Sequence, residues 1–539
     1  MRLMLVAINS QYIHSNPALY YLKQALKGSQ LQVELREYSI NMPISDLLND
    51  ICGQQPDIVS FSTYIWNIEY TVKLVKDTAL LLPDCKIILG GPEASARATE
   101  LITELHQLFA IIVGEGENIW PKLVSELLEN KQTPMSGVIF QNQQEFTLSP
   151  QVDFAALPFI YDEEDFKTLS AEKKIIYYES SRGCPYGCVF CASASEPLRE
   201  RPLEKVLSEL QILSQYAGQI KFVDRTFNAS PKRAAKIITA LLDLYRPGLS
   251  WHFEISPYIL TPEIISLLVQ APVDYFRLEA GVQSLNDDVL AAIHRSGDWQ
   301  KAKTALMQII AADNIHLHLD LIAGLPQETP DSFASAFAEI HQMAPDYLQL
   351  GFLKVLPGSL LAQTANSWGI VYSATPPYKV LDTPTMPANY LFELNRAEQV
   401  LNAFYNSGRF RQTLFYAAKL WPGGALQFYF DLAAAKLQIT TGSLSLPRKA
   451  ELLAKLLLPL NQELFFDLLR LDWLAYGDGQ PLPTILRYPQ DSKNSFFFNH
   501  QWRIIPGEIA RATNQNCYLS FDIKKKTGVS ELCQICTCN

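Results

Sequence analysis

The chain has 539 residues, of which 48% are hydrophobic and 19% are charged, and its formal net charge is −10. This length is too great for one ordinary domain and predicts about three or four. The composition supports buried cores and argues against extensive disorder. The acidic balance argues against a large nucleic-acid-binding surface.

The sequence gives no sign of membrane insertion or secretion. No run of about 18 uncharged apolar residues is present, so no membrane span is predicted. The first residues, MRLMLVAINSQYIHS, lack a small-residue cleavage pattern and predict a β-strand instead of a signal peptide. Two tight clusters contain six of the nine cysteines. Such clusters without a secretion signal predict metal sites in a reducing cytoplasm.

Residues 1–130 alternate strand-like and helix-like patterns. Strands are predicted at Leu3–Ile8, Ile58–Ser62, Lys86–Leu89 and Ala110–Val113, and helices at Pro17–Lys27, Ile68–Leu82, Ala94–Leu105 and Glu117–Glu129. This alternation is typical of a parallel, doubly wound sheet, in which ligands bind at the carboxyl ends of the strands. Three signals stand at those ends, namely SFSTYIWN (60–67), GGPE (90–93) and GEGE (114–117). Each alone is compatible with a simple turn, but together they predict a ligand site.

A second run of alternating patterns follows a connection. Prolines and the acidic segment 162–165 indicate that residues 136–174 link two domains. Strands are then predicted at Lys174–Glu179, Ile220–Val223, Ser250–Ile255, Tyr275–Gly281, His316–Ile322 and Tyr347–Val355. The intervening helices are predicted at Leu203–Tyr216, Pro231–Tyr245, Thr261–Gln270, Asp287–His294, Trp299–Ala312 and Pro330–Met343. Six strands with five intervening helical stretches, one of which contains both 287–294 and 299–312, predict a partial (β/α) barrel with its chemistry at the carboxyl ends of the strands.

Three cysteines follow the first strand of this second run. Cys184, Cys188 and Cys191 have the spacing C-x3-C-x2-C. Three thiolates on one loop can bind three irons of a [4Fe–4S] cluster and leave the fourth iron open to a substrate or cofactor. A zinc site or a chance grouping is the alternative, but Gly183 and Gly187 allow the backbone to wrap tightly around a cluster.

These motifs resemble those of the radical S-adenosylmethionine (SAM) superfamily. The cysteine loop with Phe190, GVQS (281–284), DLIAGLPQET (320–329) and LPGS (356–359) stand in that superfamily's order. The SFST, GGPE and GEGE segments resemble the cobalamin-binding domain that precedes many of these enzymes. The resemblance therefore implies three cofactors: a [4Fe–4S] cluster, SAM and cobalamin.

The resemblance also implies an α/β fold and a domain order. We expect a doubly wound, Rossmann-like cobalamin-binding domain (1–135), a linker (136–174), a partial (β/α)6 TIM-type radical SAM barrel (175–375) and a mostly helical C-terminal domain (376–539). Helices of the last domain are predicted at Asn389–Asn406, Gly408–Lys419, Gly424–Gln438 and Leu446–Asp472. This domain either only packs against the barrel or closes its open side.

Site residues follow from the same resemblance. The cluster ligands are Cys184, Cys188 and Cys191, and the residues expected at SAM are Phe190, Glu254, Gln283, Ser284 and Leu356. Those expected at cobalamin are Gln11, Tyr12, His14, Ser62, Thr63, Tyr64, Trp66, Gly90, Gly91, Pro92, Glu93, Glu115, Gly116 and Glu117. No D-x-H-x-x-G motif is present, so no histidine is expected below the cobalt, where the resemblance places Trp66 and Tyr64. Core packing is the alternative for this aromatic pair, and a salt bridge is the alternative for Glu254.

Other residues give weaker signals. Asp224, Arg225 and Asn228 occupy the place of the superfamily's amine-binding turn, but the DRTFN sequence differs from it. His316, His318 and Asp320 alternate along one strand, and a structural role is favoured over a metal site there. Four cysteines near the end of the chain form either an auxiliary metal site or a set of free thiols: Cys517, Cys533, Cys536 and Cys538.

The implied reaction is reductive cleavage of SAM to a 5′-deoxyadenosyl radical, with an electron donor such as flavodoxin or ferredoxin. Methylation of an unactivated carbon of a small-molecule or peptide substrate is the expected outcome. Cyclisation or rearrangement without methyl transfer is the alternative. A non-catalytic cobalamin sensor would need no cysteine loop. Methylthiotransferases carry three further N-terminal cysteines, whereas this domain has only Cys52 and Cys85.

Overall fold

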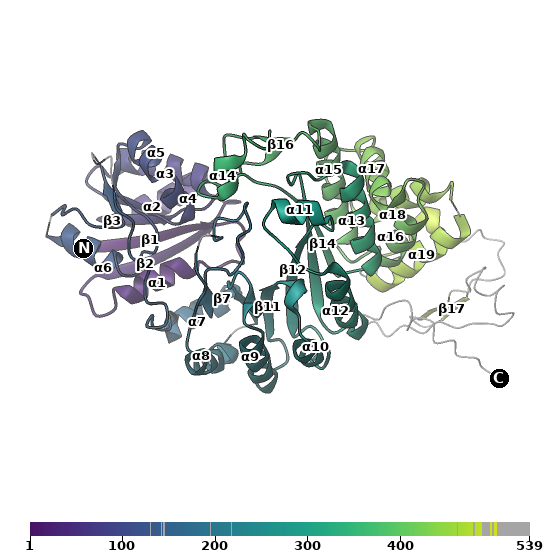
Figure 1. Ribbon diagram of the computed structural model, residues 1–539, viewed down its shortest axis with the longest axis horizontal. Coiled ribbons are helices and arrows are strands. Elements are labelled where there is room, and N and C mark those ends of the chain that lie inside the picture. Colours follow the sequence, from purple (N-terminus) through teal and green to yellow (C-terminus); the bar gives the residue numbers. More distant parts are fainter. Residues whose placement is uncertain are drawn as a thin grey trace. The chain divides into compact units, whose positions relative to one another are not determined.

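The computed structural model describes residues 1–487, except for 130, 142, 144, 145, 195, 217, 461, 478 and 479, together with 496–498 and 501–503. The chain forms two compact units (Figure 1). The first consists of Met1–Ile255, Lys354–Ser367 and Val371–Val380, and the second of Ser256–Leu353, Trp368–Ile370 and Leu381–Asn539.

The N-terminal part of the first unit contains a six-stranded sheet of order β2-β1-β3-β4-β5-β6. Its strands are β1 (Arg2–Asn9), β2 (Gln32–Ser39), β3 (Ile58–Ser62), β4 (Lys86–Gly90), β5 (Leu108–Ile112) and β6 (Val138–Phe140). The first five are parallel, and β6 is antiparallel to β5. The four predicted strands are confirmed. Strand β2 was not predicted because, at the edge of the sheet, it carries charged residues in place of an apolar run.

Helices cover both faces of this sheet (Figure 1). Helices α1 (Pro17–Ala25) and α6 (Trp120–Leu128) share one core with Leu3 and Leu5, while α2 (Ile44–Gly53), α3 (Ile68–Leu81) and α5 (Ala98–Glu104) share the other with Phe61. The helix predicted over 94–105 is two helices, because α4 (Pro92–Ala96) ends at Arg97 and α5 begins after it. The strand order reverses between β1 and β3, which is where ligands bind in such sheets.

The rest of the first unit begins the β/α repeats. Strands β7 (Ile176–Tyr178), β10 (Gln219–Phe222) and β11 (Ser250–Ile255) are parallel, and α8 (Leu203–Tyr216) and α9 (Pro231–Asp243) lie between them in the chain. The predicted connection contains a helix, α7 (Glu163–Ala171), which begins with a capping box between Asp162 and Asp165. The acidic residues that suggested a linker are therefore the start of a helix.

The second unit continues the repeats with β12 (Phe276–Gln283), β13 (His316–Ala323) and β14 (Tyr347–Phe352), which are parallel. Its helices are α10 (Pro262–Val269), α11 (Asp287–Ala292), α12 (Trp299–Ala312) and α13 (Pro330–Met343). Alternate residues of β12 and β13 are buried and apolar, while those between them are half-buried and largely polar. All six predicted strands and their helices are therefore present.

The remaining elements lead into a helical domain. They are α14 (Leu360–Thr364), β15 (Val371–Tyr372), β16 (Val380–Asp382), α15 (Ala388–Val400), a π-helical turn (Leu401–Tyr405), α16 (Arg411–Leu420), α17 (Gly424–Leu437), α18 (Leu446–Leu457), α19 (Gln462–Tyr476), β17 (Phe496–Phe498) and β18 (Gln501–Arg503). The single helix predicted over 446–472 is wrong: α18 ends beside Pro459, and α19 starts afresh. Proline has no backbone N–H, so Pro459 cannot continue the hydrogen bonds of the helix.

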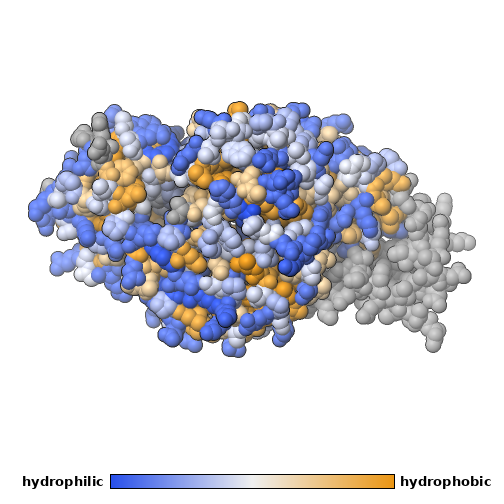
Figure 2. All heavy atoms as spheres, viewed as in Figure 1, coloured by the Kyte–Doolittle hydropathy of each residue, from blue (hydrophilic) through white to orange (hydrophobic). Residues whose placement is uncertain are grey.

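The visible surface mixes hydrophilic and hydrophobic residues (Figure 2). Exposed apolar side chains, such as Leu80 on α3 and Phe392 on α15, are scattered over several elements. Among the described helices, none has the length and apolar character required to cross a membrane.

Candidate functional site

The cysteine loop is closed at its base. Just after β7, the short strand β8 (Ser181–Arg182) pairs in antiparallel fashion with β9 (Arg199–Glu200). The two ends of loop 183–198 therefore lie next to each other. The Cys184 N–H donates to the carbonyl of Glu196 at 3.1 Å. Gly183 has a φ of +83°, and a Cβ there would lie 2.3 Å from the Pro197 carbonyl oxygen. Only glycine fits this close approach.

The three cysteines are all reduced and stand on this one loop. Cys188 is buried, while Cys184 and Cys191 are half-buried. The Cys191 N–H donates to the Cys188 carbonyl at 3.0 Å, and Cys184 Sγ lies 3.6 Å from Thr226 Oγ1. Three thiols on a tightly turned loop match the ligands that a [4Fe–4S] cluster with one open iron requires.

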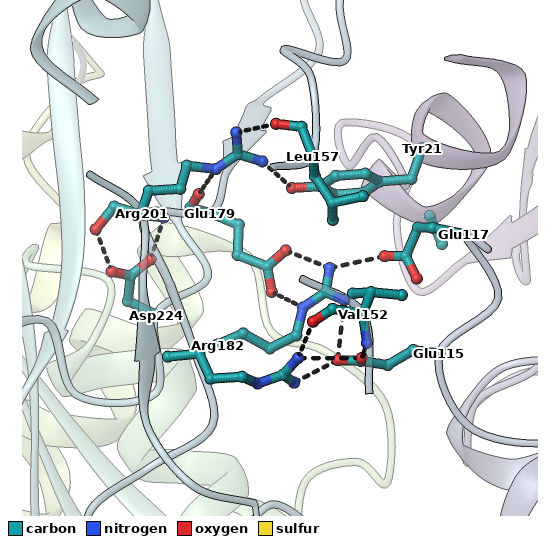
Figure 3. Close-up of polar contacts among 12 residues, drawn as sticks. Tyr21, Glu115, Glu117, Val152, Leu157, Glu179, Arg182, Arg201 and Asp224 are labelled. Atoms are coloured by element: carbon teal, nitrogen blue, oxygen red, sulfur yellow. Dashed lines mark hydrogen bonds and ion pairs between the residues drawn. The ribbon is translucent and has the colours of Figure 1, made fainter. Parts of the chain in front are cut away.

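Arg182, at the base of the loop, binds three carboxylates (Figure 3). Its guanidinium makes a bidentate pair with Glu179 at 3.0 and 2.8 Å. It also reaches Glu115 at 3.1 Å and Glu117 at 2.9 Å, both from the GEGE turn after β5. The arginine thus connects the start of the cysteine loop to the N-terminal sheet.

Arg199, at the other end of the loop, binds the same turn. Its Nη1 donates to Glu115 Oε2 at 3.1 Å, and its Nη2 donates to Glu115 Oε1. The Val152 N–H adds a donor at 2.7 Å. Burial opposes ionisation of Glu115, but Arg199, Val152 and Arg182 outweigh it and lower its pKa. We call Arg182, Arg199 and Glu115 the clamp.

Polar contacts join β1 and β3 where the strand order of the N-terminal sheet reverses. The Trp66 indole N–H and the Asn67 amide donate to the Ile8 carbonyl at 3.1 and 3.0 Å. The rings of Tyr64 and Trp66 stack 4.4 Å apart and nearly parallel, and 42% of Trp66 is exposed. The aromatic pair therefore lies at the end of β3 and offers an apolar surface to a flat ligand.

The neighbouring GGPE turn is packed tightly. Gly91 has a φ of +101°, and a Cβ there would lie 2.6 Å from the Thr63 carbonyl oxygen. Thr63 Oγ1 donates to the Gly90 carbonyl at 2.7 Å. Glu93 is buried and receives hydrogen bonds from Arg97, at 3.3 Å, and from the Tyr378 hydroxyl. These contacts hold the turns after β3 and β4 against each other.

The other residues predicted at cobalamin differ in their surroundings. Gln11 and Tyr12 are exposed after β1, Ser62 is the last residue of β3, and Pro92 is the first residue of α4. His14 lies 2.7 Å from the Tyr177 hydroxyl of β7, and burial, Lys221 and Lys174 lower its pKa.

Gly114 and Gly116 flank Glu115, and a Cβ at Gly114 would meet no atom within 4 Å. The second carboxylate oxygen of Glu117 is buried without a partner among the described residues. An open turn with a spare acceptor fits a ligand that carries amide groups, such as cobalamin.

The residues predicted at SAM are distributed over both units. In the first unit, Phe190 follows Val189, whose carbonyl accepts the Leu361 N–H at 2.8 Å, so the cysteine loop is bonded to α14, just after Leu356 and the LPGS turn. Glu254 lies 3.3 Å from Lys221. In the second unit, Ser284 donates to Glu328 at 2.5 Å, and Gln283 Oε1 is buried without a donor among the described residues. A spare acceptor at this strand end fits the hydroxyl donors of a ribose.

The weaker candidates have structural partners. Asp224 is buried and accepts from Ser180 N at 2.8 Å and Ser181 Oγ at 2.8 Å. Burial raises its pKa to about 6, although these serines oppose the shift. His318 lies 2.8 Å from Asp320. Their ligand atoms lie within 4.8 Å of Glu279, a neighbour that the sequence did not indicate. The tail cysteines Cys517, Cys533, Cys536 and Cys538 lie outside the described residues.

Three family profiles match the chain in succession. They are the B12 binding domain over residues 4–124, the Radical SAM superfamily over 178–340, and DUF4080, a protein family of unknown function, over 366–534. The chain thus combines a B12 binding domain with a Radical SAM domain. These two domains imply a [4Fe–4S] cluster, SAM and cobalamin as the cofactors.

Two methyltransferases and one solved structure are distantly similar to the chain. The cobalamin-dependent radical SAM methyltransferase TokK of Streptomyces tokunonensis is 25% identical over 59% of this chain and 50% of its own length. A 2-(S-pantetheinyl)-carbapenam-3-carboxylate methyltransferase of Streptantibioticus cattleyicolor is 26% identical over 53% of this chain and 45% of its own. The chain thus spans about half the length of these relatives. The structure of the cobalamin-dependent radical enzyme OxsB with aqua-cobalamin has a TM-score of 0.62 at 14% identity, covering 88% of this chain and 79% of OxsB, which shows the fold.

The family motifs did not indicate the clamp arginines. Arg182 and Arg199 flank the three cysteines, two residues before Cys184 and eight after Cys191. That pair of cations around a metal-ligand loop was the signal available in the sequence. Their shared partner, Glu115, is 67 and 84 residues away, so only the fold identifies it.

Proposed function

We propose that this chain is a cobalamin-dependent radical SAM enzyme that cleaves SAM reductively and methylates an unactivated carbon of a polar or peptide-like substrate. The main support for the proposal is that the candidate cluster site and the candidate cobalamin site are linked within the first unit. The reduced three-cysteine loop and the glycine-rich turn after β5 are linked directly through Arg182, Arg199 and Glu115.

When bound, the cluster supplies the electron for SAM cleavage and cobalamin supplies the methyl group. The chain's own part is to bind and orient. Cys184, Cys188 and Cys191 would hold the cluster, and Gly183 allows the loop to close over it. Tyr64 and Trp66 would support the corrin from below, with no histidine at that position.

The substrate side of the proposal rests on the second unit. Between the buried apolar residues of its strands stand Glu279, His318, Asp320 and Tyr347. In a β/α repeat fold the strand face opposite the helices lines the interior, where reactive groups gather. A face with this many polar groups suits a hydrophilic substrate better than a hydrocarbon.

The helical domain would form a side wall of the substrate site. Tyr347 Oη donates to Asn402 Oδ1 at 3.3 Å, and the Tyr347 ring lies 4.4 Å from the His318 ring. Asn402 belongs to the π-helical turn, a feature found frequently at functional sites. The turn thus contacts the same strand face that carries the polar residues.

Anaerobic reconstitution with cobalamin and methyl-labelled SAM tests the proposal. With a strong reductant, the wild type should release 5′-deoxyadenosine, and Cys188→Ala should not. Equal absence of 5′-deoxyadenosine from both would reject radical chemistry. Substrate turnover without transfer of the label would favour cyclisation or rearrangement instead. A flavodoxin or ferredoxin as electron donor, and a cytoplasmic location, are parts of the same proposal.

A further inference from the structure

Glu115 was predicted as a cobalamin contact, but its carboxylate is fully engaged within the protein. Oxygen Oε1 accepts from Arg182, at 3.1 Å, and from Arg199. Oxygen Oε2 accepts from Arg199 at 3.1 Å and from the Val152 N–H at 2.7 Å. A carboxylate has about four lone-pair sites, and here four donors use them.

The donors come from both ends of the cysteine loop. Arg182 stands on β8 and Arg199 on β9, and these two residues are register partners in the antiparallel pair at the loop's base. One acceptor on a different element therefore binds the entry and the exit of loop 183–198. Figure 3 labels Glu115 and Arg182, the residue at the entry. Any rotation of the loop about its base would break at least one of these ion pairs.

The three side chains of the clamp are largely shielded from water. The side chains of Arg182, Arg199 and Glu115 are 13%, 18% and 18% exposed. Arg182 also lies over the rings of Tyr21 and Phe154, at 5.5 and 4.9 Å from their centroids. Removing Glu115 takes from the shielded Arg199 guanidinium the carboxylate with which it pairs, which costs more than the loss of a surface pair.

Glu117 and Glu179 complete the charge pattern. Together with Glu115 they place three carboxylates around two guanidinium groups. Glu117 keeps one buried oxygen without a partner among the described residues, whereas Glu115 keeps none. Of the two glutamates in the GEGE turn, Glu117 therefore has capacity left for a ligand and Glu115 does not.

We propose that Glu115 is a positioning residue, which fixes the cysteine loop to the turn after β5 and does not itself bind cobalamin. The clamp would set where the open iron of the cluster stands relative to that turn. The consequence for catalysis rests on the proposed function, but the attachment of the loop does not depend on any cofactor.

Hydrogen exchange of the full chain, purified anaerobically without added cobalamin, tests the attachment. In Glu115→Gln, amides of residues 183–198 should exchange about tenfold faster than in the wild type, because local opening becomes easier. The matched control is Glu126→Gln, a half-buried carboxylate on α6 that accepts from Thr133 N at 3.1 Å, and it should leave this segment unchanged. Unchanged exchange in Glu115→Gln would overturn the proposal.

A cobalamin titration followed by absorbance separates the two roles of Glu115. A positioning role predicts an affinity within about twofold of the wild type in Glu115→Gln, whereas loss of a direct contact predicts a fall of about tenfold or more. The larger fall, with slow loop exchange retained, would assign Glu115 to the cofactor and refute the clamp. If the wild type binds no cobalamin, the proposed function fails while the exchange result still decides the clamp.

A second variant guards against simple misfolding. Arg199→Gln acts from the other end of the loop, and it should accelerate exchange of the same segment. In the double variant Glu115→Gln/Arg199→Gln, residues 183–198 should exchange only slightly faster than in either single variant. Each of the three variants removes the same Glu115–Arg199 interaction. Fully additive effects, or faster exchange spread over the whole first unit, would contradict a local clamp.

Discussion

The side-chain amide of Asn406 pairs with the backbone of Leu348 in both directions. Its Oδ1 accepts the Leu348 N–H and its Nδ2 donates to the Leu348 carbonyl, each at 3.0 Å. Leu348 lies on β14, an edge strand of its sheet, whose outer backbone groups meet no further strand among the described residues. The helical domain therefore satisfies an open sheet edge with one side chain.

Replacing Asn406 should loosen this edge. In Asn406→Ala, two backbone groups lose their partners, which costs about 1–3 kcal/mol. Hydrogen exchange at Leu348 should accelerate by at least about tenfold. The control Asn395→Ala removes only a weak contact with Gln399 on α15 and should change nothing at β14. Equal exchange in both variants would mean that Asn406 does not hold the edge.

Loss of one cluster thiolate should be specific to the loop. Cys188→Ala should lose most of the iron and all 5′-deoxyadenosine formation after reconstitution, because two thiolates hold a [4Fe–4S] cluster poorly. Cys52→Ala, in α2 of the N-terminal sheet domain, should keep both. Iron analysis and product chromatography measure these outcomes, and iron retained at the wild-type level in Cys188→Ala would exclude this cysteine as a ligand.

Trp66 should contribute to cobalamin binding through its stacked, exposed ring. Trp66→Ala should weaken binding by about tenfold, equivalent to about 1.4 kcal/mol, as expected for the loss of an aromatic contact. Phe392→Ala removes another exposed aromatic, on α15, and should leave the affinity unchanged. Absorbance titration with cobalamin compares the two variants. An affinity of Trp66→Ala equal to that of the wild type would assign the ring to packing alone.

Asp472 should make the helical domain less stable as the pH rises. This buried carboxyl accepts from the Thr413 and Gln412 N–H groups at the start of α16, and burial raises its pKa from 3.8 to about 7 despite these bonds. Between these values the folded state holds a proton that the unfolded state lacks, so the free energy of unfolding falls with rising pH. Each unit of pKa difference corresponds to about 1.4 kcal/mol.

Comparison with Asp472→Asn isolates this effect. The variant should unfold with a weaker dependence on pH between about 4 and 7, measured by thermal or urea unfolding. Asp243→Asn, at the end of α9 in the other unit, should retain the wild-type profile. The same slope in Asp472→Asn and wild type would show that this carboxyl does not titrate in that window.

Much of the architecture could be predicted because its signals are local. The alternation of apolar strands and helices gave all six β/α repeats, since each element depends on residues adjacent in the sequence. The cysteine spacing and the turns GGPE and GEGE are likewise contiguous. Local reasoning failed at β2, whose edge position allows charged residues, and at Pro459, where a continuous apolar pattern hides a break between helices.

What the sequence alone determined is the chemistry available: three thiolates on one loop, glycines where the backbone must approach closely, and polar residues at strand ends. Tertiary structure decided how those groups are used. Glu115 meets Arg182 and Arg199 across 67 and 84 residues, and Asn406 meets Leu348 across 58. Such pairings depend on which elements pack side by side, and no local periodicity encodes that.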